Sequence, residues 1–275
     1  MHITETFLFC KFCDIHYVKH KTLSVSAHLI PEARALIEAL SQHAVPLLLY
    51  PRESSEIAGW LTGGTGVLIQ TPISRFIITA NHVFAQMEKL RAERSTITLL
   101  GGTNAPPLDI SHWNVIDRNE RLDICIIQVP GSFEPRDIGK YFYTADFTTS
   151  STAAREDEAL IIGFPCEHRT TSVSIINTRM LPIIDFVKSV SETRFVVADP
   201  ENEREILENP SGLDVPKHMG GASGAPVFKL SLNSPSELIG IFTEGSDGLH
   251  GVYLCTHVRF LTNEGRIDLL QLPPH

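Results

Sequence analysis

The chain has 275 residues, of which 43% are hydrophobic, so it is long and apolar enough to form one large domain or two small barrels that share a core. Its formal net charge is −9, from 32 acidic and 23 basic residues, which disfavours binding to nucleic-acid phosphates and to anionic lipid. No stretch approaches the roughly 20 apolar residues that a membrane-spanning helix needs. Neither nucleic acid nor membrane is therefore an expected partner.

The first 28 residues do not predict a regular structure. They contain Cys10, Cys13, His16 and His20, and this run is open to two interpretations, a zinc site or an irregular tail. Zinc fingers place a long loop between two pairs of ligands, so that the pairs reach the ion from opposite sides. These four residues are too closely spaced for that arrangement, and we expect no metal site.

The cysteines and the start of the chain bear on the cellular compartment. The five cysteines are odd in number, and three of them stand alone in apolar runs, so they predict no disulfide framework. Cys125 and Cys255 are expected to be buried, unpaired thiols. The N-terminal sequence lacks a basic segment followed by a clean apolar one, so it does not resemble a secretory signal. Together these features predict a cytoplasmic protein.

Residues 29–43 predict a helix. Leu29, Leu36 and Leu40 recur at helical spacing, and Pro31 suits the first turn of a helix. We expect this helix to pack on the outside of a barrel.

From residue 45 the pattern changes to short β-rich runs separated by Gly, Pro and Asn, which is typical of a barrel or a sandwich. A second helix is expected over 81–94, with Val83, Met87 and Leu90 on one face. The polar residues 145–158 are expected to link two halves. The expected strands are 45–50, 65–70, 75–80, 96–100, 123–129, 159–164, 180–190, 193–199, 225–230, 237–245 and 251–258.

Three local patterns carry residues suited to nucleophilic catalysis. Thr79-Ala80-Asn81-His82 ends a strand and begins a helix, and Asp123 opens an apolar strand. The third pattern is Gly220-Gly221-Ala222-Ser223-Gly224-Ala225-Pro226-Val227, a turn that leads into another strand. Each pattern alone has an ordinary structural interpretation, as a capping histidine, a turn aspartate and a strand-entry turn. The order His, Asp, Ser within one β-rich chain is much more specific than any of the three patterns.

Nucleophilic catalysis by a serine requires a histidine and a carboxylate beside it. A serine hydroxyl is a weak nucleophile near neutral pH and needs an adjacent base, a role that suits histidine because its pKa lies near 6.5. A buried carboxylate fixes the imidazole tautomer and stabilises the imidazolium that forms. The amides of Gly221 and Ser223 are expected to form an oxyanion hole, since Gly221 lacks a Cβ and can turn its N–H toward a substrate carbonyl.

These motifs resemble those of the trypsin-like, or chymotrypsin-like, serine peptidases, in particular the cysteine-poor bacterial type. Residues 79–82 match the T-A-x-H motif, Asp123-Ile124-Cys125-Ile126 is similar to the D-[IL]-A-[LI] strand, and residues 221–226 are similar to G-[DN]-S-G-[GA]-P. The segment 159–165 resembles the strand that opens the second barrel. Residues 241–245 resemble the strand that binds the substrate backbone.

The resemblance implies an all-β fold of two six-stranded antiparallel β-barrels, over about 45–145 and 158–262. Together they would form a trypsin-like peptidase domain over 45–262, preceded by a partly helical N-terminal extension over 1–44 and followed by a C-terminal tail over 263–275. It implies a serine endopeptidase that hydrolyses polypeptide substrates through a covalent acyl-enzyme and needs no cofactor. The sequence does not indicate the oligomeric state.

The resemblance also assigns roles to single residues. His82, Asp123 and Ser223 would be the catalytic triad. Thr243 and Gly245 would bind the substrate backbone, while Gly251 and Tyr253 would form the far wall of the specificity pocket.

Gap-free counting back from Ser223 places Lys217 and His218 at the base and wall of that pocket, which would favour an acidic side chain at the cleavage site. An irregular loop over 210–221 would make this counting fail, and both interpretations stay open. The chain departs from the zymogen-activated members at Ala222, where they carry an Asp that pairs with a newly cut N-terminus. That switch is absent here.

Two other functions remain as alternatives. A catalytically silent, peptidase-like binding protein is disfavoured by the complete triad but left open by Ala222. A non-peptidase acyl hydrolase of the α/β type would need G-x-S-x-G between a strand and a helix, with the serine before the histidine. Here the serine comes last and strands flank it.

Overall fold

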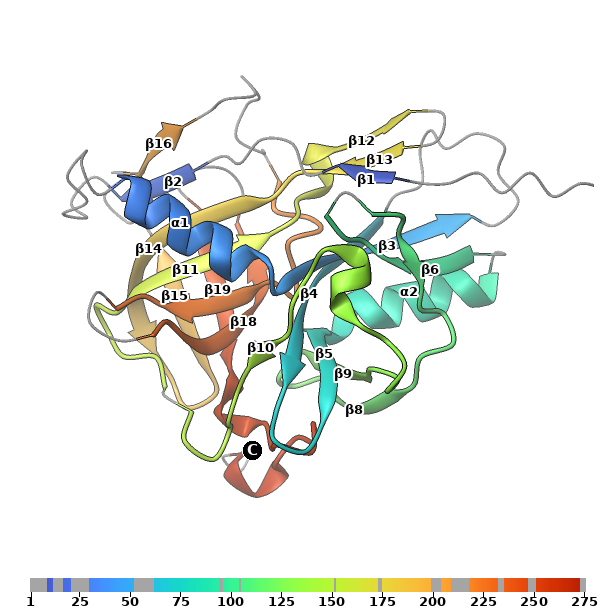
Figure 1. Cartoon of the computed structure of the whole chain (residues 1–275). Helices are drawn as coiled ribbons and strands as arrows, with labels where there is room; N and C mark the ends of the chain where they lie inside the picture. The colour runs from blue at the N-terminus through green and yellow to red at the C-terminus, as the bar shows by residue number, and fades with distance from the viewer. Residues whose placement is uncertain are drawn as a thin grey trace, which may run out of the picture.

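The computed structural model places two β-rich halves side by side (Figure 1). In its described part no helix is long and apolar enough to span a membrane. The described residues are 9–11, 17–20, 30–51, 62–93, 96–103, 105–150, 152–172, 175–198, 204–208, 218–231, 235–246 and 251–272.

The first half is a sheet in the order β7-β6-β3-β4-β5-β9-β8, whose neighbouring strands are antiparallel, with β10 added parallel to β4. The apolar runs of its central strands are almost wholly buried, as expected for strands covered on both faces. Its strands are β3 (Ala44–Pro51), β4 (Thr62–Gln70), β5 (Arg75–Ala80), β6 (Thr96–Leu100), β7 (Leu108–Asp109), β8 (Val115–Asn119), β9 (Ile124–Gln128) and β10 (Tyr143–Thr144).

The second half is a closed antiparallel barrel. The pairing runs β11-β17-β18-β19-β15-β14 and returns from β14 to β11, so these six strands form a continuous cylinder. Its strands are β11 (Glu158–Gly163), β14 (Leu181–Val190), β15 (Arg194–Ala198), β17 (Pro226–Lys229), β18 (Glu237–Gly245) and β19 (Val252–His257).

The expectation of two closed barrels is met in the second half only. Within the described residues of the first half, the edge strands β7 and β8 do not pair with each other. β7 has two residues and so offers few ladder bonds, and β8 is mostly half exposed. The interior beside these edges is filled by side chains instead, including Trp113 and Phe133, whose rings meet edge to face with centroids 5.2 Å apart.

Two helices cover the sheets. α1 (Ile30–Ser41) confirms the helix expected over 29–43 and lies across the outside of barrel strands β11 and β14 (Figure 1). Its Ile37 and Leu40 are buried in a core cluster to which both halves contribute. α2 (Asn81–Glu93) confirms the second helix and buries Val83 and Met87 against the first sheet.

The N-terminal extension contributes strands as well as α1. β1 (Phe9–Lys11) pairs in parallel with β13 (Ile175–Thr178), which pairs with β12 (Arg169–Ser172). β2 (Tyr17–His20) lies between β14 and β16 (Arg204–Glu208). The sequence patterns predicted none of the strands β1, β2, β12, β13 and β16. The short 3-10 helices are η2 (Pro135–Ile138), η3 (Cys166–His168), η4 (Val258–Phe260) and η5 (Leu269–Gln271).

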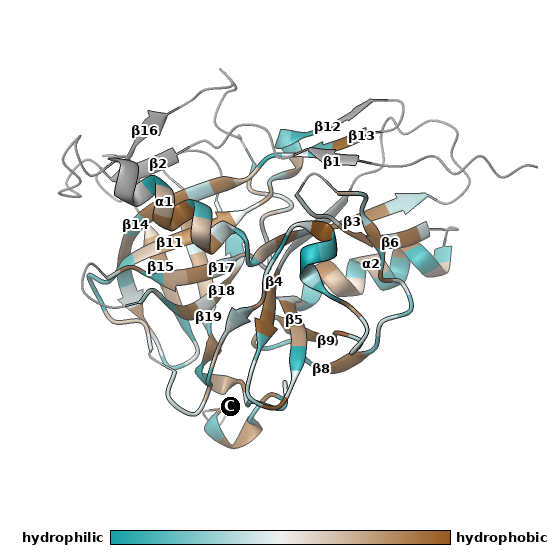
Figure 2. Ribbon diagram, in the orientation of Figure 1, coloured by the Kyte–Doolittle hydropathy of each residue, from teal (hydrophilic) through white to brown (hydrophobic). Residues whose placement is uncertain are grey.

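The core continues across the boundary between the halves. Val67 and Ile78 of the first sheet belong to the same buried cluster as Leu160 and Phe228 of the barrel. Figure 2 shows the strands of both halves as mainly hydrophobic, whereas polar residues mark the outer face of α2 and many loops. Burial of apolar surface on both sides of the boundary holds the two halves together, and the candidate site lies at this boundary.

Candidate active site

His82 is positioned by the junction of β5 and α2, of which it is the second helical residue. Thr79, three residues earlier, donates its hydroxyl proton to the carbonyl of Thr65 at 2.7 Å, which ties the end of β5 to β4. The imidazole is about half exposed, with 51% of its side-chain surface accessible. The imidazole can therefore contact a substrate, while the end of β5 holds the backbone of His82 in place.

Asp123 lies where the β5–β9 ladder ends. Ala80 pairs with Ile124, and the amide of Asn81 donates to the carbonyl of Asp123 at 3.0 Å, so the ladder places the residue before β9 beside the one after β5. The φ angle of Asp123 is 54°, in the left-handed region that a non-glycine residue rarely adopts. Such backbone strain is most often found at functional sites.

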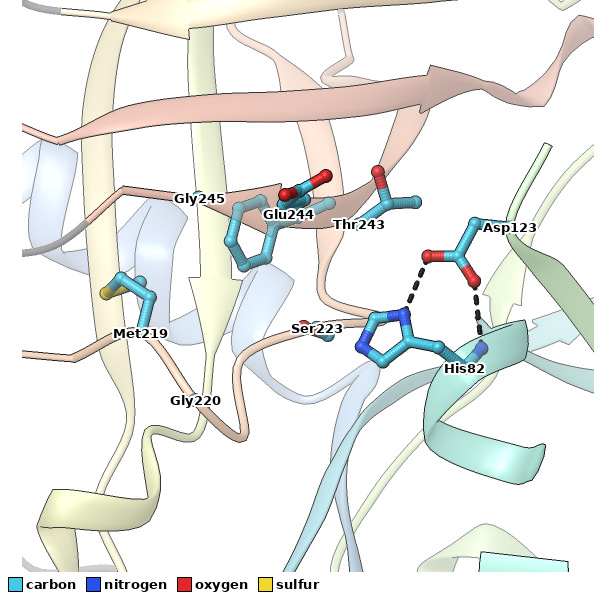
Figure 3. A pocket seen from close by; sticks show the side chains of 9 residues that line it. His82, Asp123, Met219, Gly220, Ser223, Thr243, Glu244 and Gly245 are labelled. Atoms are coloured by element: carbon cyan, nitrogen blue, oxygen red, sulfur yellow. Dashed lines mark hydrogen bonds and ion pairs between the residues drawn. The ribbon is translucent and has the colours of Figure 1, made fainter. Parts of the chain in front are cut away.

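The Asp123 carboxylate holds His82 through two hydrogen bonds (Figure 3). Oδ1 accepts from the His82 amide at 2.8 Å and Oδ2 is 2.7 Å from Nδ1 of the imidazole. An ionised carboxylate can only accept, so Nδ1 carries the proton and Nε2 is the free acceptor. The hydrogen bond that His82 donates to Asp123 raises the pKa of His82 above its ordinary value, burial opposes this, and the negative charges of Asp123 and Glu244 add to the rise.

Ser223 lies in a tight turn that precedes β17 and is shaped by glycines. Gly221 and Gly224 both have φ +91°, which side chains other than glycine rarely allow. A Cβ on Gly224 would lie 2.0 Å from the carbonyl oxygen of Thr65 and 2.4 Å from the hydroxyl of Thr79. The turn that holds Ser223 therefore packs directly against β4 and against the end of β5, which precedes His82. Only glycine fits at position 224.

The amides of Gly221 and Ser223 differ from the carbonyls of the same turn in their hydrogen bonding within the described part of the chain. Every carbonyl from Met219 to Ser223 accepts a hydrogen bond, whereas no bond from the amides of Gly221 and Ser223 is found among the described residues. Because unpaired N–H groups favour a negative oxygen, this turn can bind an anion or an oxyanion. The carbonyl of Met219 accepts from the amide of Ala222, that of Gly220 from the amide of Cys166, and that of Gly221 from the hydroxyl of Thr65. The carbonyl of Ala222 accepts from the amide of Ala225, and that of Ser223 from the amide of Thr65.

One cavity of about 410 Å³ contains all three candidate catalytic residues (Figure 3). Among the contacts of the described residues, no hydrogen bond joins Ser223 Oγ to His82, although both residues line the cavity. Such bonds are often long in the absence of substrate and shorten when it binds. The cavity is lined by His82, Asp123, Met219, Gly220, Ser223, Phe242, Thr243, Glu244 and Gly245.

The other expected site residues are distributed around this cavity. Thr243 and Gly245 line it, as does Glu244 between them. Tyr253 is buried behind it, with its ring edge to face against Phe242 at 5.7 Å between centroids, so it supports the wall without forming it.

Gly251 lies next to that ring, because a Cβ on Gly251 would be 3.1 Å from Tyr253. His218 is exposed and its amide donates to Glu167 at 3.1 Å. Lys217 lies outside the described residues, as do the side chains of the Cys10–His20 run. The substrate-binding roles of these residues stay predictions.

Sequence reasoning assigned no role to Met219, Gly220, Phe242 or Glu244. Met219 and Gly220 directly precede the Gly221-Ala222-Ser223 motif, and the other two belong to the strand segment 241–245, so their proximity to the motifs is the signal that could have found them. Within the described part of the chain, no group of three or more His, Cys, Asp or Glu side chains is arranged to hold a metal ion.

Comparison with known proteins identifies the family of the chain. Residues 64–241 match the sequence model of the trypsin-like peptidase domain, which is more than half of the chain, and the chain belongs to this family. No curated protein matches the chain. One similar solved structure comes from work on aromatic interactions that drive the coupled folding and binding of the intrinsically disordered Sesbania mosaic virus VPg protein. Its sequence identity is 12%, its TM-score is 0.44, and the match covers 79% of this chain and 88% of that chain.

Proposed function

We propose that this protein is a serine endopeptidase with His82, Asp123 and Ser223 as its catalytic triad. The observation that carries the proposal is the Asp123–His82 pair at 2.7 Å, which shares one cavity with Ser223. In the turn that holds Ser223, the amides of Gly221 and Ser223 are unpaired among the described residues. Membership in the trypsin-like peptidase family supports a polypeptide as the substrate.

In the proposed reaction, Ser223 Oγ attacks the scissile carbonyl while His82 Nε2 takes the hydroxyl proton. The carbonyl oxygen becomes an oxyanion that the amides of Gly221 and Ser223 bind. Collapse of this intermediate breaks the C–N bond, and the imidazolium returns its proton to the leaving amine. Water then attacks the acyl-enzyme by the same route, which releases the acid and regenerates Ser223. Asp123 keeps Nδ1 protonated throughout.

The proposed catalytic unit spans about 45–262, with 1–44 as an extension and 263–275 as a tail. A cytoplasmic location also remains a prediction from the cysteine pattern.

An acidic preference at the cleavage site depends on Lys217 and His218 and is part of the same proposal. A library of peptides that vary at the cleavage site tests it directly, because a cationic pocket would enrich Asp and Glu at the residue whose carbonyl is attacked.

The test of the function is turnover of casein by the purified chain, compared with a simple ester. Ser223→Ala is expected to lower peptidase turnover on the order of 10⁶-fold if the triad acts as a unit. Ser150→Ala is the matched control, because its hydroxyl is bonded to the Phe147 carbonyl and does not line the cavity. Ester cleavage without casein cleavage would favour an acyl hydrolase. Ordinary turnover by Ser223→Ala would refute the proposal.

A further inference from the structure

The hydroxyl of Thr65 is buried at the centre of the candidate site. Thr65 lies in β4 of the first sheet and has 0% exposure. Its Oγ1 donates to the carbonyl of Gly221 at 2.9 Å and accepts from the amide of Phe164 at 3.0 Å. One hydroxyl has one proton and two lone pairs, so both bonds form at once. This single group therefore joins the first sheet, the barrel and the turn before Ser223.

The backbone of Thr65 reinforces the same connection. Its amide donates to the carbonyl of Ser223 at 2.8 Å, and its carbonyl accepts from the hydroxyl of Thr79. These two bonds use main-chain atoms of Thr65 and remain when its side chain is changed. The hydroxyl contact to Gly221 can therefore be removed without removing the main-chain contact to the serine.

The turn needs such support because its orientation decides where the Gly221 amide points. In a trans peptide the C=O and N–H groups point in opposite directions. The carbonyl of Gly220 accepts from the Cys166 amide at 2.7 Å, so the N–H of Gly221 points away from Cys166. Rotation of this peptide would exchange the two groups and turn the Gly221 amide toward Cys166.

Beyond the bond from Cys166, that rotation is restrained through the neighbouring peptide, which begins at the Gly221 carbonyl. Gly221 is free of the steric limits that a Cβ imposes, so its conformation must be fixed by contacts. Ala222, the next residue, is fully buried and carries no charge that could hold the turn through an ion pair. The Thr65 hydroxyl fixes the carbonyl of Gly221 itself, and the guanidinium of Arg169 lies 3.5 Å from the same oxygen.

We propose that Thr65 is a positioning residue that holds the Gly221 amide in the orientation needed to bind the oxyanion. The inference rests on the proposed peptidase function. Thr65 contacts no substrate. It acts through the carbonyl of Gly221, and its effect is therefore expected in the transition state, where the oxyanion exists, and not in substrate binding.

The test compares Thr65→Val, which keeps the shape and loses the hydroxyl, with Thr65→Ser, which keeps the hydroxyl. Removing one oxyanion donor costs about 10²–10³ in kcat, so we expect Thr65→Val to lower kcat by at least about tenfold with KM little changed. Thr65→Ser should restore most of kcat. Affinity for a peptide boronic acid, which forms a tetrahedral adduct, should fall in parallel with kcat.

Thr71→Val is the matched control, since it also loses a buried hydroxyl, bonded to the carbonyl of Asn263 at 2.6 Å, at the far end of β4. It should lower stability without lowering kcat. Unchanged kcat in Thr65→Val, or an equal loss in Thr71→Val, would overturn the proposal.

A crystal structure of Thr65→Val gives a readout that does not depend on activity. The expected result is a rotated peptide between Gly220 and Gly221, with the Gly220 carbonyl no longer bonded to Cys166. An unchanged peptide would contradict the role of Thr65. If the wild-type chain cleaves no peptide, the proposed function fails, whereas this structural comparison still decides the inference about Thr65.

Discussion

At the scale of single residues, two carboxylates raise the pKa of His82, and they do so through different interactions. Asp123 holds the imidazole by a hydrogen bond, while Glu244 acts only through its charge, and both raise the pKa of His82. Glu244 belongs to β18 of the barrel and Asp123 precedes β9 of the first sheet, so each half contributes one negative charge. Neutral His82 is the proposed base, and its pKa sets the lower pH limit of activity.

We therefore expect kcat/KM to rise with pH through a midpoint above 6.5, the ordinary pKa of histidine. Glu244→Gln removes one of the charges that favour the imidazolium, so the midpoint should move to lower pH. Glu237→Gln, at the other end of β18, should leave it in place. A midpoint that stays or moves upward in Glu244→Gln, measured with chemistry rate-limiting, would contradict this view of the site.

The sequence predicted the triad because each member stands in a local motif and the three motifs occur in a specific order. It could not predict how the site is supported. The bonds of Thr65 to Gly221 and Phe164 join residues that are 156 and 99 positions apart, and no local pattern signals such contacts. The effect of Glu244 on His82 could not be predicted for a similar reason, since it depends on how β18 of the barrel and the start of α2 are placed in the folded chain.

At the scale of elements, helical periodicity and short apolar runs were sufficient for α1, α2 and most strands. The failure to close the first sheet follows from the length of β7 and the exposure of β8, which depend on local turns and not on periodicity. The strands β1 and β2 were missed because their residues show no clear alternation, and tertiary pairing with β13, β14 and β16 determines them.

The position of α1 leads to a prediction about stability. Ile37 is 1% exposed and belongs to the core cluster shared by both halves. Truncating a buried Ile to Ala costs about 2–5 kcal/mol of unfolding free energy, so Ile37→Ala should lower the midpoint of urea unfolding.

The neighbouring Glu38→Ala is the control, because Glu38 is exposed. Activity per titrated site should be the same in both variants, since α1 does not line the cavity. A midpoint unchanged in Ile37→Ala would show that the extension does not support the core.

At the scale of the whole molecule, the described cysteines act as separate apolar side chains. Cys125 is buried in the first sheet and Cys255 in the barrel, and both are free thiols, as the sequence predicted. Burial raises the pKa of Cys125 to about 12 and that of Cys255 well above its ordinary value, so neither forms a thiolate at neutral pH. Cohesion of the two halves therefore depends on packing and on hydrogen bonds such as those of Thr65, and not on these thiols.

Dithiothreitol is accordingly expected to leave the melting temperature nearly unchanged. Packing of the shared core does not depend on redox state, whereas a structural disulfide would contribute about 2–4 kcal/mol. Thermal unfolding followed with and without the reductant measures this. A drop of many degrees on reduction would reveal a disulfide and would reopen the question of compartment.

The most direct measurement of the central claim is covalent labelling with a peptide phosphonate, followed by mass mapping of the modified residue. The phosphonate reacts with a serine only where a base activates the hydroxyl. The proposed triad predicts one adduct per molecule, located on Ser223, with labelling abolished in Ser223→Ala and greatly slowed in His82→Ala. No adduct on the folded wild-type chain, or an adduct on a residue other than Ser223, would contradict the assignment.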